Sequence, residues 1–116
     1  MIELPQFDTG RYESCDFLMA QGNAVLTIHV EGHSPFVLHF ERARWHEFTA
    51  LYNCSGEQID KSYFRLHEVS PSPRLIAYMK NDTAATKAYK ELHHYRIFLD
   101  GTGCHEVFAE SVRADT

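Results

Sequence analysis

The chain has 116 residues, which is long enough for one domain with its own core and too short for two. We therefore expect a single domain over residues 1–116. Its 44% of hydrophobic and 23% of charged residues exclude a disordered chain. The formal net charge of −5 disfavours nucleic acid as a partner, because phosphate backbones repel an acidic surface.

The N-terminal third of the chain contains the clearest strand signal. We expect short strands around residues 2–7 and 17–21, separated by turn-forming residues. Apolar and polar residues then alternate over 24–31 and again over 36–41, with turn residues between the two runs. This pattern predicts an antiparallel hairpin. Its core row of side chains is expected to be Leu26, Ile28, Phe36, Leu38 and Phe40.

The spacing of the large apolar residues changes after this hairpin. From Trp45 to Tyr52 they are mostly three or four residues apart, which favours a short helix or helical turn over 44–53. The alternative is a strand over 41–49 with a bulge near 41–43 that exchanges its two faces.

Strand and helix signals alternate in the next part of the chain. Residues 59–69 have the composition of a strand, and the apolar run 75–79 is β-prone, which predicts a central strand. A short helix is expected over 83–92, with Asp82 or Thr83 as its cap.

A second hairpin is predicted at the C-terminal end. Residues 95–99 and 104–112 flank a turn with two glycines, which permit left-handed backbone angles. The whole pattern consists of about seven strands in mostly sequential antiparallel pairs and too few helices for repeated parallel crossovers. It predicts an α+β fold that is mainly antiparallel β, either sandwich-like or a curled sheet, with one or two short helices.

The cysteines and the N-terminus bear on the compartment. Cys15, Cys54 and Cys104 are odd in number and widely spaced, which is typical of reduced thiols and not of a disulfide framework or a zinc ribbon. The N-terminus lacks the pattern of a signal peptide, and the longest apolar run is far shorter than the roughly 20 residues of a bilayer span. We expect a cytoplasmic protein with three free thiols and no membrane partner.

The eight histidines raise the question of a metal site. His29 and His39 lie on the polar face of the first hairpin and stand opposite one another if its loop is centred on Ser34. Glu31 and Glu41 each follow two residues later, so a His/His/carboxylate site is conceivable. However, the sequence lacks the known metal-binding spacings, and polar residues are ordinary on the outer face of a sheet. His29 and His39 therefore stay disfavoured metal candidates, and we expect no cofactor.

No arrangement in the sequence assigns a catalytic residue. Cys104 and His105 are neighbours, as a nucleophile and its base have to be in space. However, adjacent residues of a strand point to opposite faces, so this pair is expected to diverge. The same reasoning separates His93 from His94, of which one is expected to face solvent and the other to pack.

The charge of the chain favours a protein partner. Residues 1–60 have a charge balance of −6, whereas the remainder has +1. An acidic surface attracts a basic protein, and arginine and tryptophan are residue types that concentrate binding energy. The candidate partner-binding residues are Glu31, Glu41, Arg44, Trp45, Glu47 and Glu57.

The sequence thus favours a non-enzymatic protein-binding module, such as an acidic inhibitor or immunity-type protein that docks a basic partner. The alternative is a small metal-dependent or histidine-based hydrolase. A binding module predicts dispersed histidines, whereas an enzyme predicts several that converge in one cleft. The identity of the partner stays open, as does the question of whether the protein forms a homodimer.

Overall fold

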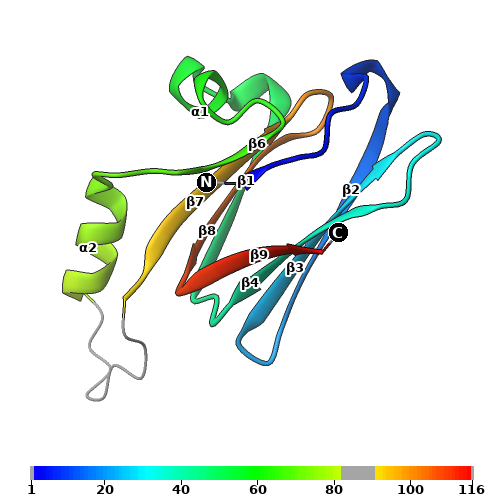
Figure 1. Ribbon diagram of the computed structural model, residues 1–116. Helices are drawn as coiled ribbons and strands as arrows, with labels where there is room; N and C mark the ends of the chain where they lie inside the picture. Colours follow the sequence, from blue (N-terminus) through cyan, green and yellow to red (C-terminus); the bar gives the residue numbers. More distant parts are fainter. Residues whose placement is uncertain (1, 82–90, 116) are drawn as a thin grey trace.

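Two antiparallel sheets make up the framework of the protein, whose computed structural model describes residues 2–81 and 91–115 (Figure 1). The five-stranded sheet has the strand order β1 (Ile2–Glu3), β6 (Arg65–Glu68), β7 (His93–Leu99), β8 (Gly103–Ala109) and β5 (Trp45–Ala50). The four-stranded sheet has the order β2 (Tyr12–Ala20), β3 (Asn23–Val30), β4 (Phe36–Glu41) and β9 (Ser111–Asp115). All strand pairs in both sheets are antiparallel, which confirms the expected fold class.

Within the described residues, the α-helices cover the outer side of one sheet only. The helices α1 (Gly56–Asp60) and α2 (Pro73–Asn81) lie on the outer side of the five-stranded sheet (Figure 1). Short 3-10 turns, η1 (Thr9–Arg11) and η2 (Leu51–Asn53), lead into β2 and out of β5. The inner faces of the two sheets enclose one hydrophobic core. Within this part of the chain, neither helix has the length and apolar character that a bilayer crossing needs.

The first predicted hairpin is confirmed. β3 and β4 pair from Ala24 opposite Phe40 to Ile28 opposite Phe36. The alternation of burial along β3 follows the alternation of apolar residues in the sequence. The inward row is buried except for Phe36, which is partly buried at the margin of the core: Leu26, Ile28, Leu38 and Phe40.

The second hairpin is confirmed over β7 and β8, but the strand expected over 104–112 is divided between the two sheets. β4 and β5 are divided in the same way, at the same corner. There the Glu110 N–H donates to the Glu41 carbonyl at 3.0 Å, and the Arg44 N–H donates to the Phe108 carbonyl at 2.8 Å. Because β4 pairs with β9 and β5 pairs with β8, the four strands are one two-stranded ribbon that folds over at this corner.

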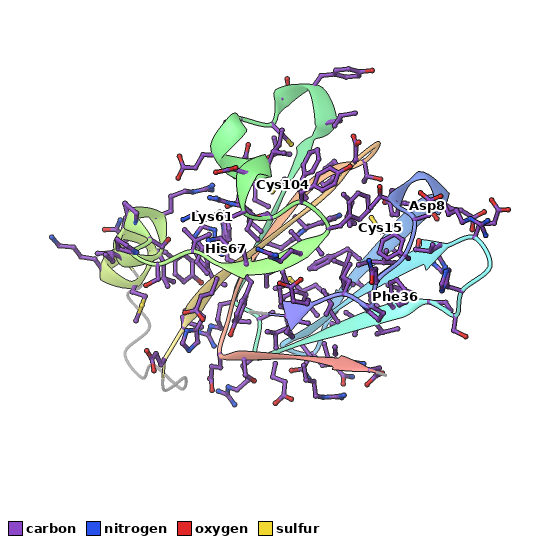
Figure 2. All side chains as sticks on the ribbon, turned by 45° about the horizontal axis from the view of Figure 1, so that its top comes forward. Asp8, Cys15, Phe36, Lys61, His67 and Cys104 are labelled. Carbon is purple, nitrogen blue, oxygen red and sulfur yellow. The ribbon has the colours of Figure 1, made fainter. Side chains whose placement is uncertain are left out.

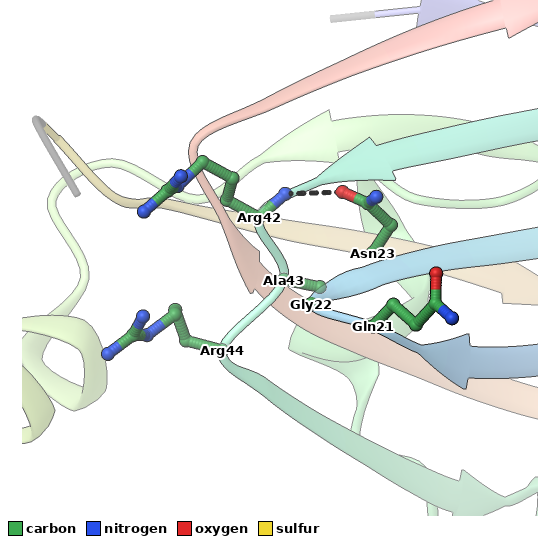
Figure 3. Close-up of a pocket in the computed structure, with 6 residues that line it drawn as sticks. All are labelled: Gln21, Gly22, Asn23, Arg42, Ala43 and Arg44. Atoms are coloured by element: carbon green, nitrogen blue, oxygen red, sulfur yellow. Dashed lines mark hydrogen bonds between the residues drawn. The ribbon is translucent and has the colours of Figure 1, made fainter. Parts of the chain in front are cut away.

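The bend in this ribbon is made by residues 42–44. Arg42 has a positive φ of 52°, which turns the chain sharply from one sheet to the other. Its N–H donates to the side-chain oxygen of Asn23 at 3.0 Å, and its guanidinium pairs with Glu110 at 2.7 Å. A hollow of about 610 Å³ lies beside this bend. Figure 3 shows its lining residues, with the side chains of Arg42 and Arg44 extended to the same side.

The helix expected over 44–53 is wrong. Residues Trp45–Ala50 form β5, which pairs with β8 along its whole length, and only the 3-10 turn η2 follows. The spacing was misleading because the strand has large residues on both faces. Trp45 stacks on Phe108 on the outer face, whereas Phe48 contacts His105 on the inner one.

Two expectations for the middle of the chain are also corrected. The run 75–79 is not a strand but part of α2, because the Ser72 side chain accepts the Leu75 N–H and caps the helix, with a proline following in the first turn. The strand expected over 59–69 is confined to β6, because a capping box starts α1 upstream. The helix expected over 83–92 falls mostly on residues 82–90, which lie outside the described residues.

We predict that the inward row of the first hairpin holds the core together. Replacing the fully buried Ile28 by alanine should lower the free energy of unfolding by about 2–5 kcal/mol, because it removes apolar contacts and leaves a cavity. Thr27→Ala, one residue away on the outer face, is the matched control and should cost less than about 1 kcal/mol. Chemical denaturation of both variants gives the comparison, and equal losses would contradict the assignment of the core.

We predict a second, steric sensitivity at Gly103. This residue has φ of +140°, and a Cβ atom there would lie 2.2 Å from the carbonyl oxygen of Thr49 on the neighbouring strand. Gly101 also has a positive φ, of +94°, but a Cβ atom there meets nothing within 4 Å. Gly103→Ala should therefore cost at least about 3 kcal/mol and Gly101→Ala about 1–2 kcal/mol in thermal or chemical unfolding. Similar losses at both glycines would exclude the clash as the cause.

Candidate functional site

The residues that the sequence suggests for partner binding lie on two sides of the molecule. Glu31 follows β3 and Glu41 ends β4, so they lie at opposite ends of the first hairpin on the four-stranded sheet. Trp45 and Glu47 lie on β5, an edge strand of the five-stranded sheet, and Glu57 lies in the first turn of α1 beside that sheet. The expected residues therefore do not form one surface.

Trp45 is packed into the fold and is not presented as a free anchor. Its ring stacks on that of Phe108 with 4.2 Å between centroids, and the Arg74 guanidinium lies 4.8 Å from the centroid of the Trp45 ring. Arg74 also pairs with Glu47 at 3.0 Å. These contacts hold α2 against β5. Arg44 belongs to the bend of the ribbon, just before Trp45.

His29 and His39 are not opposite one another. The register of the hairpin places His39 opposite Val25, four residues from His29 along β3. Each imidazole pairs instead with a carboxylate: His29 Nε2 lies 2.8 Å from Asp16, and His39 Nε2 lies 2.7 Å from Asp115. The described residues contain no group of three His, Cys, Asp or Glu side chains that could hold a metal ion.

The outer face of the four-stranded sheet is a more coherent candidate surface, which we call the acidic face. Neither α1 nor α2 lies over it (Figure 1). Its apolar centre is half-buried, whereas Leu18 at its edge is 65% exposed. We define the acidic face by ten outward residues of the four strands, which are Asp16, Leu18, Val25, Thr27, His29, Val37, His39, Glu41, Arg113 and Asp115.

Carboxylates outnumber cations on the acidic face. Asp16, Glu41 and Asp115 contribute three negative charges against the single charge of Arg113, which lies 3.5 Å from Glu41. The hydrogen bond from His39 lowers the pKa of Asp115, so this carboxyl is ionised at neutral pH. A shallow hollow of about 330 Å³ lies here, with His39, Glu41 and Arg113 among its lining residues.

A second candidate is a buried polar cluster between the helices and the five-stranded sheet, defined by Gln58, Ser72, His94, Arg96 and Glu106. Ser72 Oγ lies 2.7 Å from His94 Nδ1, and His94 Nε2 lies 2.7 Å from Glu106 Oε1. Arg96 Nε donates to the same carboxylate oxygen at 3.1 Å, and Gln58 Nε2 donates to the other oxygen at 3.0 Å. The Glu106 carboxylate therefore contacts groups from β7 and α1 directly. Through His94 it is also linked to Ser72, the cap of α2.

Electrostatics keep this carboxylate ionised. Burial by itself raises the pKa of Glu106, but hydrogen bonds from His94 and Gln58 and the charge of Arg96 outweigh burial and lower the pKa to about 2. A pocket of about 350 Å³ opens beside the cluster. Its lining includes all five residues of the polar cluster, together with Arg74, Pro71 and Pro73.

The sequence did not indicate the polar cluster, because Ser72, His94 and Glu106 come from three separated segments without a motif spacing. The one local signal was strand alternation at His93 and His94. His93 pairs with Glu68 at 2.8 Å and is partly exposed, whereas His94 is 1% exposed, as the alternation predicts.

A third cluster lies between the two sheets. Cys15 Sγ is 3.5 Å from His105 Nε2, and His105 Nδ1 is 2.9 Å from His46 Nε2, with the His46 ring stacked on Phe17. Burial raises the pKa of the Cys15 thiol, which makes it a poor nucleophile. Cys104 lies on the other face of β8 from His105, as expected, and all three cysteines are free. Cys15 and Cys104 are labelled in Figure 2.

Comparisons with known proteins do not assign a family. A scan against protein-family models, a search of curated proteins and a search of solved structures each found no match to this chain. The acidic face and the polar cluster therefore carry the functional interpretation.

The His105–His46 pair predicts that acid destabilises the fold. Burial, and then the charge of His46, lower the pKa of His105 to about 4 from an ordinary value of 6.5. Between these two pH values the unfolded chain binds more protons than the native one. The contribution of neutral His105 to stability is therefore complete above the pKa of this residue in the unfolded chain. It is lost as the pH falls through the lower pKa of His105 in the native protein.

We expect His105 to lower the free energy of unfolding by about 3 kcal/mol between pH 7 and pH 4. His105→Phe, which keeps an aromatic ring beside Phe17 and Phe48, should remove this part of the pH dependence. Chemical denaturation of both proteins at several pH values measures the difference. Parallel pH profiles would contradict the prediction.

Proposed function

We propose that the protein is a protein-binding domain that docks a basic protein partner on the acidic face. The observation that carries this proposal is a sheet face that neither α1 nor α2 covers, on which Val25 and Val37 form an apolar centre bordered by Asp16, Glu41 and Asp115. Apolar centres with polar, charged rims are the common anatomy of protein interfaces. The partner is of the kind that an acidic inhibitor or immunity-type protein neutralises.

The acidic face is preformed for such a contact. Its strands are hydrogen-bonded neighbours, and the core packs directly beneath them. The carboxylates of Asp16 and Asp115 are held by His29 and His39. A surface that is already ordered loses little conformational entropy on binding, so more of its contact energy appears as affinity. The exposed side chain of Leu18 adds apolar area that a partner would bury.

The charge of the surface selects the class of partner. The acidic face has an excess of carboxylates, and Glu31 adds another at the end of β3. Such a field speeds the encounter with a basic protein and opposes an acidic one. A second copy of this chain is therefore disfavoured as the occupant, because two acidic faces repel one another.

The helix-covered side is less suited to docking. Trp45, Arg74 and Glu47 are already engaged in holding α2 on the five-stranded sheet, so a partner there would compete with contacts of the fold itself. For the compartment, we infer the cytoplasm, which the three free cysteines support because reducing compartments keep thiols unpaired.

The proposal predicts that binding depends on charge at one face only. Affinity purification from native cells would provide the partner, whose binding is then followed by surface plasmon resonance. Asp16→Lys with Asp115→Lys should slow association by at least tenfold, because long-range attraction acts mainly on the encounter rate. Raising the ionic strength should slow association of the unchanged protein and affect dissociation less.

The matched control changes net charge equally on the other side of the molecule. Glu57→Lys with Asp60→Lys alters two exposed carboxylates in α1, away from the acidic face. This control should keep an association rate within about threefold of the unchanged protein, since only distant charges differ. Circular dichroism establishes that both double variants are folded. Equal effects of both pairs, or an association rate indifferent to salt, would overturn docking on the acidic face.

A further inference from the structure

The polar cluster has an arrangement that docking does not require. We propose that Ser72 is a nucleophile for acyl transfer, with His94 as its general base and Glu106 as the positioning residue, acting on small esters that enter the adjoining pocket. Ser72, His94 and Glu106 form a continuous hydrogen-bonded chain with both links at 2.7 Å. All three line the same pocket of about 350 Å³. This inference is independent of the acidic face, which lies on the other side of the molecule.

The ionised Glu106 fixes the position of one proton in this hydrogen-bonded chain. Glu106 is ionised and accepts hydrogen bonds only, so His94 Nε2 must carry a proton and donate it to the carboxylate. The proposed general-base role requires the neutral imidazole, in which the lone pair on Nδ1 accepts the Ser72 hydroxyl proton. Ser72 Oγ accepts the Leu75 N–H at 3.1 Å, so its own proton is free to point at His94. The two ring nitrogens are used in the reverse order of the serine-protease triad.

The surroundings of Ser72 supply charge stabilisation. Ser72 caps α2, and the N-terminal end of a helix favours negative charge. Arg74, in the first turn, also lines the pocket and has its guanidinium 3.6 Å from Glu106. The backbone N–H of Arg74, in the same turn, is therefore our candidate donor to an oxyanion, and its guanidinium, which pairs with Glu47, adds positive charge at the pocket wall. Ser72 is 5% exposed, which limits the substrate to a small acyl group.

The reaction is a two-step hydrolysis. Ser72 Oγ forms a bond to the ester carbonyl carbon while its proton passes to His94 Nδ1, and Glu106 stabilises the resulting imidazolium. The bond from this carbon to the alkoxy oxygen then breaks, and that oxygen takes the proton and leaves as an alcohol. Water adds to the acyl-serine and gives a proton to His94, and Ser72 leaves with that proton. The products are a carboxylic acid and an alcohol.

A phosphorylating probe distinguishes a reactive serine from one that only caps a helix, because only the reactive serine forms a covalent adduct with the probe. The folded protein is treated with excess diethyl fluorophosphate, which forms an Oγ–P bond and releases fluoride together with the hydroxyl proton. Intact mass and peptide mapping should show one adduct per chain, on Ser72. His94→Gln should slow its formation more than 100-fold, because the general base is lost. Ser70→Ala, two residues before Ser72, is the matched control and should react at the unchanged rate.

Hydrolysis of p-nitrophenyl acetate provides the second readout. The unchanged protein should release p-nitrophenol at least 100-fold faster than Ser72→Ala. Because that variant also removes the cap of α2, Ser72→Thr is included, which keeps a hydroxyl at the cap. It should retain the fold and a reduced rate. Glu106→Gln should lower the pH at which labelling reaches half its maximum, since the imidazolium loses its carboxylate partner.

Each of these measurements is able to overturn the proposal. A folded protein that forms no adduct on Ser72 at saturating probe would have a purely structural serine. An adduct that forms equally fast in His94→Gln would exclude His94 as the general base. Hydrolysis that Ser72→Ala does not slow would place the activity at another site. Failure here leaves docking on the acidic face untouched, because the two tests share neither residues nor readouts.

Discussion

The carboxylate of Glu106 is the constraint on which the helical layer depends. It is 1% exposed, and burying a charge in this way is tolerated only when donors surround it. His94 and Arg96 from β7 and Gln58 from α1 provide those donors, and Arg74 from α2 approaches it at 3.6 Å. Two helices that are too short to be stable alone are therefore positioned by the need to satisfy one charge on β8.

This arrangement makes the molecule two-sided. The helices that satisfy Glu106 cover the five-stranded sheet and border the pocket beside the polar cluster. The four-stranded sheet has no buried charge to satisfy on its outer face, where Asp16 and Asp115 pair with histidines at the surface. Chemistry is therefore proposed on one side and recognition on the other, and neither depends on the other for its geometry.

Sequence reasoning succeeded where local periodicity determines the structure. In the first hairpin, the alternation around Leu26 and Ile28 specifies both the strand and its buried face. It failed where contacts between residues that are distant in the sequence, or a local cap, determine the secondary structure. The run 75–79 is β-prone by composition, but it becomes helical because Ser72 caps it. The polar cluster was beyond prediction for the same reason, since topology alone brings its residues together.

The folded-over ribbon has a consequence for how the protein unfolds. In a sandwich of two separate sheets, one sheet is able to open while the other persists. Here the same two backbone stretches run through both sheets, and hydrogen bonds such as that from Glu110 to Glu41 join them at the bend. Opening either sheet exposes strand edges and core of the other. We therefore expect the two layers to unfold as one cooperative unit, in which slow amide hydrogen exchange extends across the bend from one sheet to the next.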